Sequence, residues 1–195
     1  MADVRAATRA EIPKLAATLA SAFMRDPVMV WLIPERNREE RARRFFARQL
    51  ANTIKHESVF TTDDYVGVAI WLPPDQWKVA TGDVVRSIPA MVRSFGPRLP
   101  RLLGSLGVIE KHHPADVPHW YLEFLGTRAD TQRKGVGSSV IGFMLDRCDQ
   151  EGIPAYLEAS SPENVPFYRR HGFEAVQDLQ LRNGPPLWGM WREPR

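Results

Sequence analysis

The sequence contains a single cysteine, Cys148, among its 195 residues. One cysteine cannot form an intramolecular disulfide, so a disulfide-stabilised secreted scaffold is excluded. The sequence also lacks any apolar run near the roughly 20 residues that a membrane-spanning helix requires. Its first residues, MADVRAATRAEIPK, contain no apolar stretch of the kind found in signal peptides. We therefore expect a cytoplasmic protein without a membrane partner.

The charge is nearly balanced, with 26 Lys and Arg residues against 23 Asp and Glu residues. This small excess does not predict a nucleic-acid partner, although it is compatible with an anionic ligand. Residues 35–54 are rich in arginine, but glutamates lie among the arginines and apolar residues recur on one helical stripe. An amphipathic helix with a solvated arginine face is therefore preferred to a polyanion-binding surface.

Histidine is also scarce, and its distribution does not indicate a metal site. His112 and His113 precede a proline in a predicted loop, and His119 begins a predicted strand. A zinc site needs three or four ligands, and the one cysteine is remote in the sequence. We expect no metal, and a core position for the Cys148 thiol on the apolar side of its helix.

Hydrophobic periodicity predicts a chain that mixes strands and helices. Strands are expected at 3–7, 58–62, 66–72, 119–127, 155–159, 173–181 and 186–192. Helices are expected between Thr8 and Phe23, at 35–54, twice within 73–107, at 135–150 and at 163–171. No repeat or low-complexity linker divides these elements, and the length suits one domain, so residues 1–195 are predicted to form a single domain.

A glycine-containing segment between the strand at 119–127 and the helix at 135–150 carries the clearest chemical signal. Gln132, Gly135 and Gly137 occupy the key positions of a Q/R-x-x-G-x-G/A loop. Glycines let the backbone approach a ligand closely. Successive N–H groups of the loop and of the first helical turn then form a concavity that binds anions. We expect a pyrophosphate to bind Gln132, Arg133, Lys134, Gly135, Val136, Gly137 and Ser138, where the two cations add positive charge.

Two other phosphate-binding loops do not fit this segment. A Rossmann G-x-G-x-x-G fingerprint fails because Val140 stands at the last glycine position. A Walker loop fails because the sequence contains no G-x-x-x-x-G-K-[ST]. Taken alone, the segment is also compatible with a glycine-containing helix start that binds nothing.

A second segment, 155–173, follows at close spacing and carries Glu158, Asn164 and Tyr168. The two segments together resemble the GNAT superfamily of CoA-dependent N-acyltransferases. VRAATRAEIP, FMRDP, HHPADVPHWYLEFLG and GPPLWGMWREP further resemble puromycin N-acetyltransferase and its relatives within that superfamily. The resemblance implies a mixed α/β fold with a mostly antiparallel, twisted sheet, splayed at the acyl-CoA site and flanked by helices. It also implies transfer of an acetyl group from acetyl-CoA to a primary amine of a small molecule.

The resemblance implies roles for several of these residues toward acetyl-CoA, the expected co-substrate. Backbone groups of Leu125, Gly126 and Thr127 would contact the acyl arm, and Asn164 would contact the pantetheine or phosphate portion. Gly126 suits a bulge or a close approach. Tyr168 would be the general acid, because a phenol with a pKa of about 10 can protonate a leaving thiolate whose conjugate acid has a pKa of about 8.5. Transfer would be direct, within a ternary complex.

Two glutamates are candidates for the general base that accepts the proton of the attacking amine. Glu123 and Glu158 each lie in an apolar strand, where desolvation raises the pKa of a carboxyl group. A purely structural role remains the alternative for each. The resemblance to puromycin N-acetyltransferase favours Glu158.

The acceptor pocket is predicted to draw on Phe23, Asp26, Trp31 and Trp120, and the further candidates are Trp71, Trp77 and His119. Asp26 could equally cap the segment that begins at Pro27. A closed pocket roofed by residues 73–107 would favour a small-molecule acceptor, whereas an open groove would favour a protein or peptide amine. An acyl-CoA-binding module without turnover is the third alternative, and both a monomer and a homodimer remain open.

Overall fold

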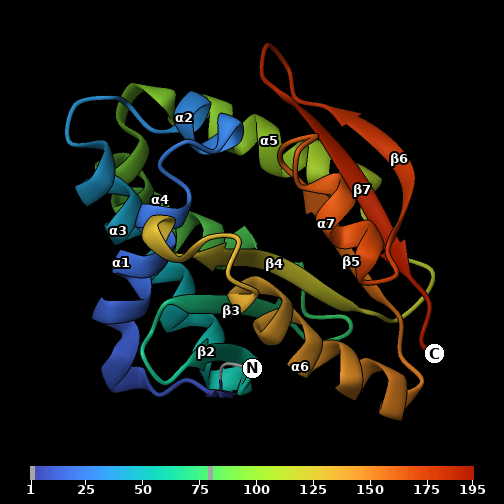
Figure 1. The fold of residues 1–195 in the computed structure, drawn as a ribbon. Helices are drawn as coiled ribbons and strands as arrows, with labels where there is room; N and C mark the ends of the chain where they lie inside the picture. The colour runs from blue at the N-terminus through green and yellow to red at the C-terminus, as the bar shows by residue number, and fades with distance from the viewer. Residues whose placement is uncertain (1–2, 79–80) are drawn as a thin grey trace.

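The computed structural model describes residues 3–78 and 81–195 and contains one seven-stranded sheet in the order β1-β2-β3-β4-β5-β7-β6 (Figure 1). Only β4 and β5 pair in parallel, and every other neighbouring pair of strands is antiparallel. The predicted mostly antiparallel sheet is therefore confirmed. Its strands are β1 Val4–Ala6, β2 Val59–Thr62, β3 Gly67–Leu72, β4 Trp120–Thr127, β5 Ala155–Ala159, β6 Glu174–Gln180 and β7 Pro186–Arg192.

Seven α-helices are found in the described residues, and local sequence explains where several of them begin and end. The Asp26 carboxylate accepts a 2.9 Å hydrogen bond from the backbone N–H of Met29 and thereby caps the short helix that begins at Pro27. The helix Val136–Glu151 is followed by the capping residue Gly152, whose positive φ of 65° favours glycine. The helices are α1 Ile12–Ala22, α2 Pro27–Leu32, α3 Arg38–Thr53, α4 Thr81–Phe95, α5 Leu99–His112, α6 Val136–Glu151 and α7 Val165–Arg170.

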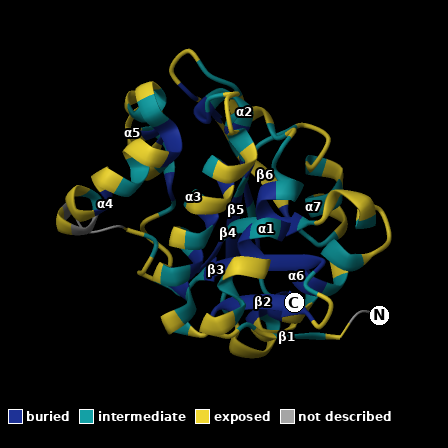
Figure 2. Ribbon diagram, turned by 90° about the vertical axis from the view of Figure 1, so that its left-hand side faces the viewer, coloured by how far each residue is buried: buried dark blue, intermediate teal, exposed yellow. Residues whose placement is uncertain are grey.

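The alternation of side chains along β3 divides the core into two layers. Val68 and Ile70 join the cluster that contains α1, α3 and part of the α4–α5 pair. Ala69 and Trp71 join the cluster on the other face, which α6 covers. Cys148 is buried in this second cluster, as predicted for a core thiol. Figure 2 shows buried residues concentrated along the central strands, with exposed residues on the outer surfaces of α4 and α5.

The sheet opens between its only two parallel strands. Pairing of β4 with β5 involves three residues of each strand and stops at Leu122 opposite Leu157. Beyond this point β4 continues to Thr127 without a β5 partner, while it still pairs with β3 as far as Thr127. The splay that the family resemblance implied is therefore present on the β5 side of β4.

A β-bulge lies in β4 at the start of the splay. Ile70 faces Phe124 and Trp71 faces Leu122, so Glu123 is an extra residue in β4. The bulge is at Glu123 rather than at Gly126, which the sequence suggested. Gly126 instead permits a close approach of α1, because a Cβ atom there would lie 2.9 Å from the Cβ of Ala22.

The structure differs from two predictions about the middle of the chain: the end of the second helix and the loop position of His112. Residues 73–107 do contain two helices, as predicted, but α5 continues through His112. His112 is therefore helical, and only His113 begins the connection to β4. The pattern of apolar residues could not place this helix end, because the last turn of α5 is polar.

Candidate active site

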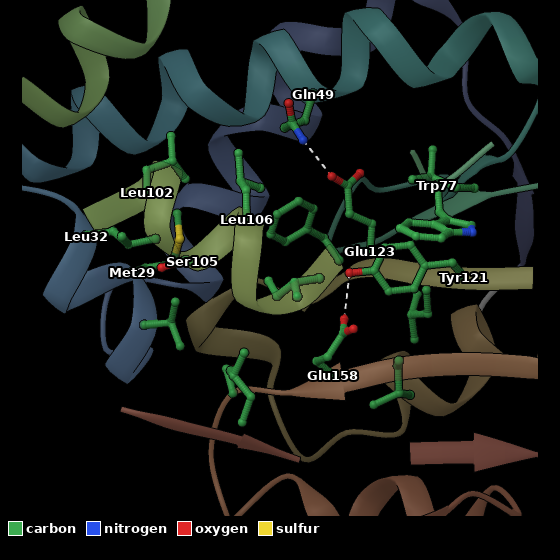
Figure 3. Close-up of a pocket in the computed structure, with 18 of the residues that line it drawn as sticks. Met29, Leu32, Gln49, Trp77, Leu102, Ser105, Leu106, Tyr121, Glu123 and Glu158 are labelled. Atoms are coloured by element: carbon green, nitrogen blue, oxygen red, sulfur yellow. Dashed lines mark hydrogen bonds between the residues drawn. The ribbon is translucent and has the colours of Figure 1, made fainter. Parts of the chain in front are cut away.

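A cavity of about 330 Å³ lies between the splayed strands and helices α2 to α5. Gln49 from α3, Glu123 and Tyr121 from β4, and Glu158 from β5 lie at one end of it (Figure 3). Apolar side chains from α2 and α5 face the same space from the other end: Met29, Leu32, Leu102 and Leu106. The cavity thus joins a polar end on the sheet to an apolar end among the helices.

The bulged residue Glu123 lies within hydrogen-bond distance of α3. Its Oε1 accepts a 2.6 Å hydrogen bond from the Nε2 of Gln49. Burial raises the pKa of the Glu123 carboxyl to about 7, and the nearby Glu158 carboxylate adds to the rise. At neutral pH the Glu123 carboxyl therefore lies near the midpoint of its titration, where it can both accept and release a proton.

The second carboxylate, Glu158, is held by β4. Its Oε2 accepts a 2.6 Å hydrogen bond from the hydroxyl of Tyr121. Burial beside this carboxylate raises the pKa of Tyr121, so the phenol stays protonated and remains a donor. The other oxygen of Glu158, Oε1, lies 3.7 Å from the Nδ1 of His113. Tyr121 thus orients one oxygen of Glu158 and leaves the other directed toward His113.

Tyr168 belongs to α7, which lies across the splay from β4, and it lines the cavity. Burial, together with the nearby Asp26 carboxylate, raises the pKa of Tyr168. Asp26 itself accepts a short hydrogen bond from the Ser160 hydroxyl, and burial raises its pKa. Both oxygens of Asp26 accept hydrogen bonds from the chain, so this residue ties the start of α2 to the end of β5.

Helices α4 and α5 form the roof of the cavity, and specific contacts hold them over it. Arg98, between the two helices, donates to the carbonyl oxygens of Val30 and Ile33 at 2.9 and 2.8 Å. Arg48 of α3 donates a 3.0 Å hydrogen bond to the Ser87 hydroxyl on α4. Residues 79–80, at the start of this segment, lie outside the described part of the chain.

The glycine-containing loop lies at the N-terminus of α6. Arg133 and Gly135 both have positive φ, at 63° and 83°, and turn the chain into the helix. The N–H groups in the first turn of a helix have no acceptor within that helix, and they attract negative charge. The predicted anion-binding residues Gln132 to Ser138 therefore include a helix N-terminus, with exposed Arg133 and Lys134 beside it.

Some of the predicted site residues line the cavity and others do not. Those that line it are Phe23, Asp26, Glu123, Leu125, Glu158, Asn164 and Tyr168. Gly126 and Thr127 follow Leu125 at the end of β4, and Gly137 packs near Thr127 and Phe167. These positions put the elements expected to bind CoA at the open end of the splay.

Trp31 and Trp120 lie away from the cavity, contrary to the predicted acceptor pocket. Trp120 is buried on the α6 side of β4, where its Nε1 donates a 3.1 Å hydrogen bond to Glu151. Trp31 packs against Gly184 and lies under the guanidinium of Arg101. Both tryptophans fill the core beside neighbouring elements, so neither is available to a ligand in this cavity.

Several cavity residues were not predicted from the sequence: Gln49, His113 and Tyr121. Trp77, a further candidate for the acceptor pocket, does line the cavity, whereas Trp71 is buried on the α6 side of the sheet. A signal for Tyr121 was present, because residues two apart in a strand share a face and Tyr121 is two residues before Glu123. Gln49 and His113 come from a helix and a connection, and nothing local marks them. Among the described residues, no cluster of His, Cys, Asp and Glu could hold a metal ion, and no helix is long and apolar enough to cross a membrane.

Comparison with known proteins agrees with this geometry. Residues 101–193 match the model of the acetyltransferase (GNAT) domain family. An uncharacterized N-acetyltransferase of Schizosaccharomyces pombe is 31% identical over an alignment covering 93% of this chain and 79% of that protein.

Solved structures share the fold. The crystal structure of histone acetyltransferase HPA2 and related acetyltransferase from Corynebacterium glutamicum has a TM-score of 0.76 and 27% identity, covering 100% of this chain and 98% of that one. The PaiA N-acetyltransferase of Thermoplasma acidophilum, in complex with coenzyme A, has a TM-score of 0.61 and 12% identity, covering 99% of each chain. At 12% identity the second likeness concerns the fold alone.

Proposed function

Because this chain belongs to the GNAT acetyltransferase superfamily, we propose that it transfers an acetyl group from acetyl-CoA to a primary amine of a small molecule. The observation that carries the proposal is the roofed cavity, which ends on two carboxylates where β4 and β5 separate. The roof made by α4 and α5 supports a small acceptor rather than a peptide. Its apolar end suits an acceptor that bears an apolar or aromatic group beside its amine.

The residues present fit acetyl-CoA, the co-substrate of this superfamily. Beyond Leu122 the backbone of β4 has no β5 partner, so peptide groups from Glu123 to Thr127 can bond to an extended ligand in the splay. The N-terminus of α6, with Arg133 and Lys134, would hold the pyrophosphate. Asn164 lines the same opening. When bound, acetyl-CoA supplies the acetyl group as a thioester.

The carboxylates supply the base. A primary amine arrives largely as an ammonium ion and must lose a proton before its nitrogen can attack. Glu158 accepts this proton directly or through water, with Tyr121 holding its other oxygen in place. Glu123, whose pKa burial and the nearby Glu158 carboxylate raise to about 7, is the alternative base.

The phenol of Tyr168 supplies the acid. As the bond between the amine nitrogen and the acetyl carbon forms, the carbon–sulfur bond breaks and the sulfur takes a proton. Tyr168 lines the cavity at the splay, and its raised pKa keeps the hydroxyl protonated at neutral pH, so that it is available as a donor to the sulfur. Cys148 lies on the buried face of α6, and burial raises its pKa to about 12, so an acyl-cysteine step is not favoured.

The test is to measure CoA release from acetyl-CoA with amine-bearing antibiotics including puromycin, polyamines, amino acids and histone-tail peptides. Turnover with a small amine, abolished in Glu158→Gln, would support the proposal. Turnover with peptides alone would support a protein acceptor instead, which the name of the Corynebacterium glutamicum structure favours. Binding of acetyl-CoA with no release for any amine would contradict an enzymatic role.

A further inference from the structure

We infer that His113 is a second proton acceptor of this site: Glu158 takes the proton that the acceptor amine loses and passes it to His113. A hydrogen bond with His119 sets the tautomer of His113 that this transfer requires. The inference rests on the proposed acetyl transfer. It starts from two buried polar atoms that lack hydrogen-bond partners among the described residues, the Nδ1 of His113 and the Oε1 of Glu158. These two atoms lie 3.7 Å apart and face each other.

The imidazole of His113 is rigidly placed at the wall of the cavity. Its ring stacks on the Trp77 indole with centroids 3.8 Å apart, and the edges of Tyr121 and Tyr156 enclose it. The side chain is 0% exposed, and that of Glu158 is 5% exposed. A histidine that only fills space would satisfy both ring nitrogens, because unpartnered buried polar atoms are costly. Within the described part of the chain, His113 satisfies only one.

The hydrogen bonds of His119 determine which nitrogen of His113 is free. The Nδ1 of His119 lies 2.7 Å from the carbonyl oxygen of Val117, and a carbonyl can only accept, so Nδ1 must carry the proton. Burial lowers the pKa of His119, which favours its neutral ring. Its Nε2 is then an acceptor. The Nε2 of His113, 2.9 Å away, must donate to it.

In a neutral ring, this chain of donors puts the free lone pair of His113 on Nδ1, which lies 3.7 Å from the Oε1 of Glu158. The proton balance follows directly. The amine proton moves to Glu158, and from its Oε1 to the Nδ1 of His113, which becomes an imidazolium beside a regenerated carboxylate. The proton returns to water once the product has left the cavity. Direct transfer requires the 3.7 Å separation to shorten to hydrogen-bond distance, and catalytic contacts are commonly longer before substrates bind.

The charged and titratable groups around His113 favour this transfer. Glu158 and Tyr156 face it from β5, Tyr121 from β4, and His119 from the connection before β4. Asp75 and Glu158 add negative potential at the histidine pair, and Glu123 adds it at Glu158. Both tyrosines have raised pKa values and stay neutral. The cation Lys78, whose Nζ lies 5.4 Å from the Trp77 ring centroid, pairs with Glu110 at 3.7 Å, so carboxylates are the charges that stabilise an imidazolium here.

The first experiment compares His113→Gln with His112→Gln in acetyl transfer to whichever amine the panel identifies. The glutamine amide keeps a donor toward His119 but cannot accept a proton, and we expect kcat/KM near neutral pH to fall on the order of 10–100-fold. The deficit should shrink at high pH, and the KM for acetyl-CoA should not change. His112 is a matched control, because its Nδ1 bonds to the Val108 carbonyl and it does not line the cavity. A deficit independent of pH would overturn the inference.

A rescue series separates proton transfer from simple filling of space. In His113→Ala, imidazoles of graded basicity and similar size should restore turnover in proportion to their basicity. Restoration that follows size alone would contradict the role of His113.

The third experiment determines where the two histidines carry their protons and does not depend on turnover. Nitrogen-15 spectra of the free protein should show the proton of His119 on Nδ1 and that of neutral His113 on Nε2. A proton on Nδ1 of neutral His113 would overturn the inference. If these tautomers are found but the protein acetylates no amine, the proposed function is contradicted. The role of His113 in catalysis is then contradicted as well.

Discussion

The Nε2 of Gln49, on α3, donates a 2.6 Å hydrogen bond to the Oε1 of Glu123, the extra residue in the bulge of β4. This contact joins the N-terminal half of the chain to the strand that carries the splay. It favours the ionised form of Glu123 and opposes the burial that raises its pKa to about 7. The titration of Glu123 therefore depends on a residue 74 positions away in the sequence.

Replacing Gln49 with methionine should raise the pKa of Glu123 above about 7, because a donor to the carboxylate is lost while the side-chain volume is nearly kept. Carbon-13 spectra of the glutamate carboxyl groups across a pH titration measure the change. Asn52, about one turn further along α3, also lines the cavity but is not the donor to Glu123, so Asn52→Ala serves as the control. An unmoved Glu123 titration in Gln49→Met would show that the hydrogen bond does not tune this carboxyl.

Glu123→Gln should stabilise the folded protein at alkaline pH. The pKa of Glu123 is raised from 4.5 to about 7, so the folded state binds this proton more tightly than the unfolded chain does. The stability from this group is therefore complete below about pH 4.5 and is lost as pH rises through about 7. By pH 8 the loss is on the order of 3 kcal/mol.

Urea unfolding at pH 8 and at pH 4.5 measures this effect. Glu123→Gln should gain up to about 3 kcal/mol over the parent protein at pH 8 and much less at pH 4.5. Glu174→Gln, at an exposed position at the start of β6, is the matched control and should behave alike at both pH values. Equal gains at both pH values for Glu123→Gln would contradict a raised pKa.

Tyr168→Phe should lower kcat by on the order of 10–10³-fold, because the leaving sulfur loses its proton donor while the aromatic ring stays in place. The affinity for acetyl-CoA, measured by calorimetry, should remain nearly unchanged. Tyr65→Phe removes a phenol from the turn between β2 and β3, and should leave kcat intact. Full activity of Tyr168→Phe would remove this residue from the role of acid.

Gly126→Ala should destabilise the protein by about 1–3 kcal/mol in urea unfolding, because overpacking forces neighbouring atoms to move. The added Cβ would lie 2.9 Å from the Cβ of Ala22 and 3.0 Å from the Cδ2 of Leu19, so α1 would have to shift away from β4. Gly142→Ala, on α6 with nothing within 4 Å, should instead stabilise the protein by about 1 kcal/mol. If Gly126→Ala leaves the free energy of unfolding unchanged, α1 can move away from β4 without destabilising the protein.

The elements that carry the donor side of the chemistry were predictable because their signals are local. The strand at 155–159 is β5 without change, and the loop with Gly135 lies directly before α6, where the sequence put it. A glycine at positive φ before a helix and an alternating apolar strand need no knowledge of distant residues. The family resemblance then supplied the order of these pieces.

The acceptor side was less predictable because it depends on which face of a strand each residue takes and on what packs over it. Trp120 was assigned to the pocket, yet it is out of phase with Tyr121 and Glu123 and faces α6. The bulge that places Glu123 left no mark on the sequence. Gln49 and His113 meet the carboxylates only through tertiary packing of α3 and α5, which no local pattern encodes.

The segment between β3 and β4 holds both roof helices, although these two strands are antiparallel neighbours that a short hairpin turn would suffice to join. The roof of the cavity is thus formed by one continuous stretch of chain, whereas the opposite wall comes from the sheet and the glycine-containing loop leads into α6. That stretch also carries His113, so its exchange between homologous chains should change the roof of the cavity and this histidine together, while the loop before α6 stays as it is.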